Sequence, residues 1–243
     1  ASLCQLGSLQ AASLGAITQR GYLAVAVKDN RPPLGFRDPR GNLIGFEIDL
    51  ARRLAAELIG NAEAVRLVPV TNKERLRVVT HGEVDMAIAA VTATANRARL
   101  VSFSTPYYLD GVAILTAKAD IQRLADLNKR TIAVLQNSTT IAVIQHTLPT
   151  ANLMMAASYR AGETLLQSDQ ADAFAGDASI LAGWIQEYPR YRLLPTLLTV
   201  EPLCIAMPKG VQHDSLHRRV NQALTRWQDD GWLRQQATSW GLP

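Results

Sequence analysis

The sequence predicts an α/β fold with mainly parallel sheets, on three observations. Short apolar runs alternate with amphipathic helical patterns, which is the arrangement of strands and helices in a parallel sheet. The alternation starts twice, since a second series follows Tyr108, and two lobes are therefore expected. The chain has 243 residues, of which 48% are hydrophobic and 19% charged, and this suits one or two folded domains and excludes a disordered chain.

The first series begins with a strand and a helix. Residues 23–27 form a continuous apolar run, typical of a strand buried on both faces. Further on, Phe46, Leu50, Leu54 and Leu58 recur at a spacing of four, which puts one apolar stripe along a helix.

The series continues with residues 65–70 as the next strand and residues 73–79 as a helix. His81 and Gly82 end that helix, because glycine favours the position just past a helix C-terminus. Residues 84–91 then supply an apolar run that suits another buried strand. The predicted order is therefore strand, helix, strand, helix, strand.

The second series repeats this pattern. Its predicted strands are residues 112–116, 131–135 and 171–175, and a helix is expected from Ser138 to about His146. A second α/β lobe is the simplest interpretation of this series.

The last part of the chain contains one strand and two helices. Residues 203–207 are apolar and strand-like. Helical spacing then relates Leu216, Val220 and Leu224, and a shorter helix is expected over residues 233–240.

Composition and charge exclude several classes of function. The net charge is +4 and the basic residues are scattered, so nucleic acid is not an expected partner. No run of 18 strongly apolar residues predicts a transmembrane helix. The start of the chain lacks Met and a basic segment, which suggests a mature chain whose signal peptide has been removed. Cys4 and Cys204 could form a disulfide or remain as two buried thiols.

Motifs for catalysis are absent from the sequence. There is no G-x-S-x-G, H-E-x-x-H, G-x-G-x-x-G or Walker lysine motif. His213 and His217 have the i, i+4 spacing of a metal pair, but no third ligand is near in sequence, and a solvated helix face is favoured. We therefore expect that the protein is not an enzyme and that it binds neither a metal ion nor a cofactor.

Polar residues follow three predicted strands, where ligands bind in open α/β sheets. Arg97, close after Thr92, can bind a carboxylate through two parallel hydrogen bonds or cap a surface turn. Ser138 and Thr139 open a predicted helix, whose free N–H groups can bind an anion or be capped by these side chains. Asp177 can accept an ammonium group or cap the helix that follows it.

Six stretches of the chain stand in a specific order and spacing: RGYLAV at 20–25, GFEIDLA at 45–51, GEVD at 82–85, FSTPYY at 103–108, ADAF at 171–174 and DG at 230–231. Through them, across residues 21–241, the chain resembles the type II periplasmic solute-binding proteins of amino-acid ABC importers (solute-binding protein family 3). The resemblance implies two α/β lobes that enclose a ligand and are joined by two crossing strands near residues 107–111 and 201–204. The lobes would span residues 1–109 with 204–243, and residues 110–203.

The resemblance also implies ligand-binding residues for the backbone groups of an amino acid. Arg97 would bind the α-carboxylate, with help from Thr92, from the backbone near Ala90 and from Ser138 across the cleft. Asp177 would accept the ammonium group. A zwitterion needs one cationic and one anionic partner, and these residues supply both.

Side-chain specificity is expected from Lys28 and Arg75. The stretches at 27–33 and 71–75 resemble those of glutamate- and aspartate-binding members, in which a basic residue at each position reaches the side-chain carboxylate. Two desolvated cations repel unless an anion lies between them, so an acidic L-amino acid is expected, with glutamine or another polar amino acid as the alternative. Asn72 is also expected among the residues of this part of the site. Thr139 is expected beside Ser138 in the part that binds the α-carboxylate.

The chain departs from the family pattern at two places. Arg31 stands where many members have an aromatic ring that stacks on the ligand, and Leu203-Cys204 stands where many have Tyr-Gly. Arg31 either adds a third cation to the pocket or turns to solvent.

The expected protein is thus a monomeric, periplasmic or lipid-tethered binding protein that delivers its ligand to an ABC permease. Two alternatives share the fold. One is the sensor domain of a signalling protein or glutamate-gated channel, and the other is an enzyme such as a dehydratase, which is disfavoured because only Asp177 stands out as a general acid.

Overall fold

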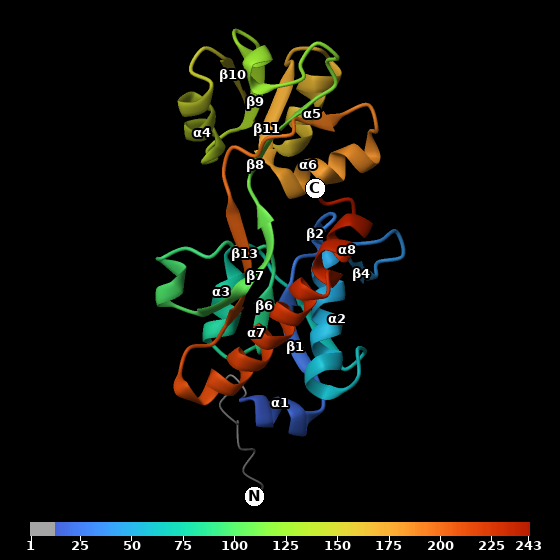
Figure 1. Ribbon diagram of the computed structural model, residues 1–243, viewed down its shortest axis with the longest axis vertical. Coiled ribbons are helices and arrows are strands. Elements are labelled where there is room, and N and C mark those ends of the chain that lie inside the picture. The colour runs from blue at the N-terminus through green and yellow to red at the C-terminus, as the bar shows by residue number, and fades with distance from the viewer. Residues whose placement is uncertain (1–12) are drawn as a thin grey trace, which may run out of the picture. The chain divides into compact units, whose positions relative to one another are not determined.

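The computed structural model describes residues 13–243 and contains two compact α/β units (Figure 1). The first unit comprises residues 13–108 and Pro202–Gln236, and the second comprises Leu109–Glu201 and Ala237–Pro243. The predicted fold class, an α/β protein of two lobes, is confirmed.

The first unit is built on a five-stranded sheet of order β5-β1-β6-β13-β7, in which β1 is parallel to β5 and β6. Its strands are β1 (Leu23–Val27), β5 (Val65–Pro69), β6 (Met86–Ile88), β7 (Ser102–Asp110) and β13 (Glu201–Met207), with a small sheet of β2 (Asn30–Arg31), β3 (Gly35–Arg37) and β4 (Leu43–Ile44). Its helices are α1 (Leu14–Arg20), α2 (Phe46–Ile59), α3 (Glu74–Thr80), α7 (Asp214–Asp229) and most of α8 (Trp232–Ser239), with the 3₁₀ turns η1 (Arg97–Arg99) and η3 (Val211–His213).

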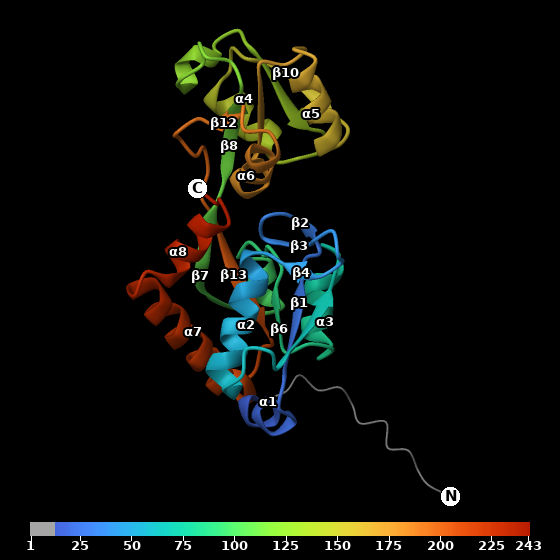
Figure 2. The same cartoon turned by 90° about the vertical axis from the view of Figure 1, so that its right-hand side faces the viewer.

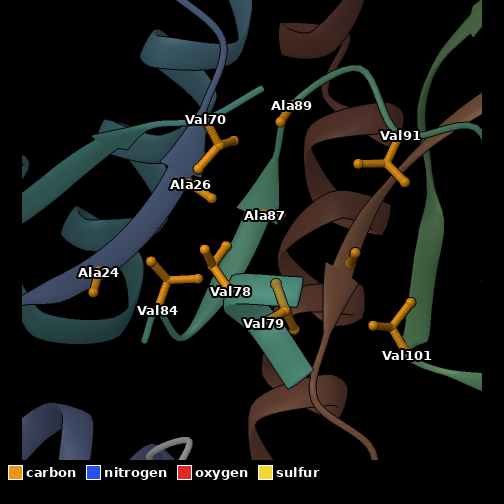
Figure 3. Close-up of a cluster of buried hydrophobic side chains, with 11 residues drawn as sticks. Ala24, Ala26, Val70, Val78, Val79, Val84, Ala87, Ala89, Val91 and Val101 are labelled. Carbon is orange, nitrogen blue, oxygen red and sulfur yellow. The ribbon is translucent and has the colours of Figure 1, made fainter. Parts of the chain in front are cut away.

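The core of the first unit lies on both faces of this sheet, as the apolar run at residues 23–27 predicts. Ala24 and Ala26 point to the face covered by α3, where they pack with Val78 and Val79 (Figure 3). The alternate residues of β1 point to the opposite face, on which α2 packs (Figure 2). Small side chains on the α3 side let this helix lie close to the strands.

The start of α2 is fixed by backbone contacts. The N–H groups of Phe46 and Glu47 donate to the carbonyl oxygens of Pro33 and Leu34, at 3.0 and 2.8 Å. Gly45 precedes the helix at φ +129°, and a Cβ there would lie 2.3 Å from the carbonyl oxygen of Leu34, so this approach requires glycine. The first turn of α2 is therefore held against the chain that follows β2.

The second unit has its own five-stranded sheet, of order β10-β9-β11-β8-β12. Helices α5 and α6 pack on one face and α4 on the other. Its elements are β8 (Val112–Thr116), η2 (Leu124–Leu127), β9 (Thr131–Leu135), α4 (Thr140–Thr147), β10 (Asn152–Ala156), α5 (Tyr159–Gln167), β11 (Ala173–Asp177), α6 (Ala178–Glu187) and β12 (Arg192–Leu193).

Two strands carry the chain between the units. β7 leaves the first unit, β13 returns to it, and the two are neighbours in the sheet of the first unit. The expected lobes change after residues 109 and 203, whereas the observed units change after Tyr108 and Glu201. The observed division also places residues 237–243 with the second unit, where Gln186 Nε2 donates to the carbonyl oxygen of Trp240 at 2.5 Å.

Some sequence-based expectations differ from the structure. The strand expected at residues 84–91 is shorter, because the chain turns at Ala90, which has φ +52°. The strand expected at 171–175 is shifted to Ala173–Asp177. Cys4 lies outside the described residues, and Cys204 is a buried free thiol. None of the helices within residues 13–243 has the length and apolarity that crossing a lipid bilayer requires.

Candidate ligand-binding site

A cavity of about 590 Å³ in the first unit lies at the ends of β1 and β5. Lys28 and Val70 follow these two parallel strands, and Lys28 Nζ donates to the carbonyl oxygen of Val70 at 2.9 Å. Lys28 is only 5% exposed, and its burial, followed by the charge of Arg75, lowers its pKa. The cavity is lined by Lys28, Asp29, Asn30, Pro69, Val70, Thr71, Asn72, Lys73 and Glu74.

The segment before α3 forms one wall of this cavity. The Glu74 carboxylate accepts hydrogen bonds from the N–H and hydroxyl groups of Thr71, at 3.0 and 2.8 Å. These bonds close a turn that leaves Asn72 exposed on the cavity wall. Lys28 and Asn72, two of the residues predicted for the side-chain part of the site, thus line one cavity.

Arg75 is buried behind this turn. Its Nη1 donates to the carbonyl oxygens of Ala89 and Ala90, at 2.9 and 2.5 Å. Burial, together with the charges of Arg97 and Arg31, lowers the pKa of Arg75 to about 10, so the guanidinium is still charged at neutral pH. Arg75 therefore combines a positive charge with a structural role on the turn after β6.

The backbone of Ala90 already has protein partners. Its N–H donates to Glu47 Oε1 at 2.7 Å, while its carbonyl oxygen accepts from Arg75. The sequence predicts that the backbone near Ala90 helps to bind a carboxylate, but the Ala90 N–H is already donated to Glu47. The turn itself is fixed from both sides.

Arg97 and Thr92 lie together just beyond this turn. Arg97 Nη1 donates to the carbonyl oxygen of Thr92 at 2.8 Å, and Thr92 forms an isolated bridge with Leu203 of β13. Arg97 is half-buried and begins the 3₁₀ turn η1. Its guanidinium is thus oriented by one hydrogen bond and keeps further N–H groups for a ligand.

Four cations of the first unit interact electrostatically, and we call them the cationic cluster. The charges of Arg97 and Arg31 lower the pKa of Arg75, and those of Arg75 and Arg31 lower the pKa of Lys28. At Lys28 the charge of Asp29, followed by that of the buried Glu47, opposes this effect, and Glu47 also opposes it at Arg75. The cationic cluster consists of Lys28, Arg31, Arg75 and Arg97.

The remaining predicted site residues, Ser138, Thr139 and Asp177, belong to the second unit. Thr139 is the N-cap residue of α4 but its side chain makes no capping hydrogen bond, and the buried Ser138 Oγ has no hydrogen-bond partner within residues 13–243. Asp177 ends β11 and occupies the N-cap position of α6, again without a side-chain capping bond. Simple capping therefore does not account for these three residues.

Sequence reasoning missed two residues that the structure places behind the site. Glu47 is fully buried, and its Oε1 accepts a hydrogen bond of 2.5 Å from the Tyr107 hydroxyl as well as the one from Ala90. Both residues stand in motifs that carry the family resemblance. An acid in the first turn of a helix whose apolar residues are buried was the available signal, since such an acid needs polar partners.

Metal ligands do not gather in the described part of the chain. Residues 13–243 contain no group of three or more His, Cys, Asp or Glu side chains arranged to hold a metal ion. His217 Nε2 lies 2.9 Å from the carbonyl oxygen of Pro208.

In open α/β sheets, small ligands bind beyond the carboxyl ends of the strands, where the polar residues of this chain lie. The model of the bacterial extracellular solute-binding proteins, family 3, matches residues 23–243, and the chain belongs to this family. The family resemblance seen in the sequence is thereby confirmed, and with it an extracytoplasmic class of protein.

Individual relatives differ in the ligand for which they are named. The glutamine-binding protein of Geobacillus stearothermophilus is 32% identical over 204 residues, 83% of this chain and 78% of the relative. The glutamate-binding protein GluB of Corynebacterium glutamicum is 27% identical over 236 residues, 92% of this chain and 79% of the relative.

A solved structure with a similar fold is the Ancestral Cationic Amino Acid Solute Binding Protein (AncCDT-1). It has a TM-score of 0.81 and 30% identity, and the match covers 94% of this chain and 99% of that one. A second solved structure is that of the ancestral amino acid-binding protein AncCDT-1, a precursor of cyclohexadienyl dehydratase. The ligands for which these proteins are named thus include neutral, acidic and cationic amino acids. The ligand of this chain therefore has to be inferred from the residues of its own site.

Proposed function

We propose that the protein binds an acidic L-amino acid, glutamate or aspartate, and delivers it to the membrane subunits of an ABC importer. The observation that carries the proposal is the cationic cluster. Four positive charges, opposed by the buried Glu47 and by Asp29 on the cavity wall, favour a ligand with two carboxylates over a ligand with one.

Each part of the ligand has a proposed partner. Arg97 and Thr92 bind the α-carboxylate, and Lys28, at the cavity beside Asn72, binds the side-chain carboxylate. Asp177 of the second unit accepts the ammonium group. Ser138 and Thr139 supply neutral hydrogen-bond donors to the α-carboxylate.

A neutral ligand such as glutamine is the second candidate, and one observation favours it. Arg75 gives Nη1 to Ala89 and Ala90, so part of its hydrogen-bonding capacity is used inside the protein. Lys28 then remains as the main donor to a side-chain oxygen, which an amide can also accept. The named relatives include both kinds of binder.

We further propose that the protein binds without catalysis and acts as a monomer. The proposed partners of the ligand are charge and hydrogen-bond complements of an amino acid, and Asp177, the acid among them, is assigned to the ammonium group. A dehydratase reaction would instead require an acid placed to protonate a leaving group.

Isothermal titration of refolded, ligand-stripped protein tests the function. L-glutamate, L-aspartate, L-glutamine and L-arginine are the ligands, and micromolar binding of an acidic amino acid with at least about tenfold weaker glutamine is expected. Tighter binding of glutamine would replace the first candidate by the second. Absence of binding to all four would overturn the assignment of an amino-acid ligand.

A further inference from the structure

Glu47 has an unusual environment for an ionisable group. It is fully buried, and its Oε1 accepts hydrogen bonds from the Ala90 N–H and the Tyr107 hydroxyl. Its Oε2 has no hydrogen-bond partner in the part of the chain that the structure describes. Burial of a carboxylate with one oxygen unpaired is unfavourable unless positive charge compensates it.

The compensating charges belong to the cationic cluster. Burial raises the pKa of the Glu47 carboxyl, and the hydrogen bonds from Tyr107 and Ala90, followed by the charges of Arg31 and Arg75, act against this rise. The geometry links the same groups, because the Ala90 N–H is held by Glu47 while the Ala90 carbonyl oxygen is held by Arg75. Acid and base thus fix one strained turn from its two sides, at φ +52°.

We infer that Glu47 is a positioning residue that also sets ligand specificity: it holds the turn at Ala90 and, through its charge, limits how strongly the cationic cluster prefers an anionic ligand. The inference rests on the proposed function in one respect, namely that the cationic cluster binds an amino acid. It adds a residue that does not itself contact the ligand.

Two separable effects follow. The hydrogen bonds of Glu47 position Ala90 and Arg75, so their loss weakens every amino acid alike. The negative charge of Glu47 opposes the cationic cluster, so removal of the charge alone favours glutamate over glutamine. One unit charge several ångströms from the ligand, at an effective dielectric constant of about 20 to 40, changes this preference about fivefold or more.

The test is the ratio of the dissociation constants of glutamine and glutamate in the Glu47→Gln variant. Glutamine keeps an oxygen that accepts from Ala90 and Tyr107 but carries no charge. We expect the ratio to rise about fivefold over the wild-type ratio in isothermal titration. An unchanged ratio, or an equal loss for both ligands, overturns the charge effect.

Glu47→Asp tests the positioning effect and remains informative if the first variant does not fold. Aspartate keeps the charge but is one methylene shorter, so its carboxylate moves away from Ala90. Glutamate and glutamine should both bind more weakly, and the ratio of their dissociation constants should stay within about twofold of the wild-type ratio. Unchanged affinities, or a ratio that changes several-fold, would overturn the inference.

Asp85→Asn is the matched control. Asp85 is also buried in the first unit, where it accepts from the Ala24 N–H at 2.7 Å and pairs with Arg20 at the opposite end of β1 from Lys28. This variant should lower the melting temperature and leave the ratio unchanged. If wild type prefers glutamine, the proposed acidic ligand fails, but the shift in Glu47→Gln still decides the role of Glu47.

Discussion

Lys28 Nζ donates a hydrogen bond of 2.9 Å to the carbonyl oxygen of Val70, across the ends of two parallel strands. Val27 pairs with Pro69, so the residues that follow them, Lys28 and Val70, lie beside each other. The ammonium group is therefore held in place by the backbone, with two of its three N–H groups remaining for other partners. This relationship makes Lys28, and not Arg75, the cleaner test of side-chain recognition.

Lys28→Met should weaken glutamate binding at least about tenfold and glutamine binding less than about threefold. Methionine keeps most of the side-chain volume but removes the charge that is proposed to meet the side-chain carboxylate. Isothermal titration measures both constants. Equal losses for the two ligands would remove Lys28 from side-chain recognition.

Arg97→Ala should weaken every amino acid at least about a hundredfold, which corresponds to about 3 kcal/mol. The reason is loss of the proposed partner of the α-carboxylate, which all amino acids share. Arg99→Ala is the control, because Arg99 lies in the same short turn and is exposed. Micromolar binding retained by Arg97→Ala would refute the assigned role.

Asp177→Asn should weaken glutamate at least about thirtyfold and leave glutarate, which lacks the amino group, within about threefold of wild type. Comparison of the two ligands separates ammonium recognition from general damage to the second unit. The control is Asp169→Asn, a change of an exposed acid in the same unit that pairs with Lys118. If glutarate and glutamate lose the same affinity, Asp177 does not bind the ammonium group.

Gly162→Ala should destabilise the protein by about 1–3 kcal/mol. A Cβ at this position of α5 would lie 2.1 Å from Phe174 Cε2, in the core of the second unit. Gly15→Ala in α1 is the control. A Cβ added at Gly15 would lie 4.0 Å from Ser13 Oγ, which leaves room for it, and alanine favours a helix. Urea unfolding measures both variants, and equal stability of the two would contradict the packing argument.

The Cys204 thiol should resist alkylation in the native protein at pH 8. It is 2% exposed, and burial raises its pKa to about 11, so only about one thiol in a thousand is ionised at that pH. The rate should rise as the pH approaches 11 or when the protein is unfolded in urea. Mass spectrometry of the peptide that contains Cys204 measures the reaction, and rapid native labelling would show that the thiol is accessible.

Much of the fold could be predicted because the strong patterns are local. The strands at residues 112–116 and 131–135 and the helix through Phe46 and Leu58 are confirmed. The small sheet of β2, β3 and β4 was missed, because two- and three-residue strands are too short to show an alternating pattern.

The sequence identifies the cations of the candidate site more readily than the groups that hold them in place. A basic residue after a strand is visible in the sequence, and Lys28 and Arg75 are both found buried. What Arg75 contacts depends on the turn at Ala90, and that turn depends on Glu47, 43 residues earlier in the chain. Such a dependence joins three separate segments, and no local pattern records it.

The two crossing strands also set the order in which the chain can complete its parts during synthesis. β13 pairs with β6 and lies between β6 and β7, so the sheet of the first unit lacks an inner strand until residue 207 has been made. All five strands of the second unit lie between residues 112 and 193 and emerge before that point. A ribosome-bound chain can therefore finish the second sheet first, although the N-terminal lobe is begun earlier.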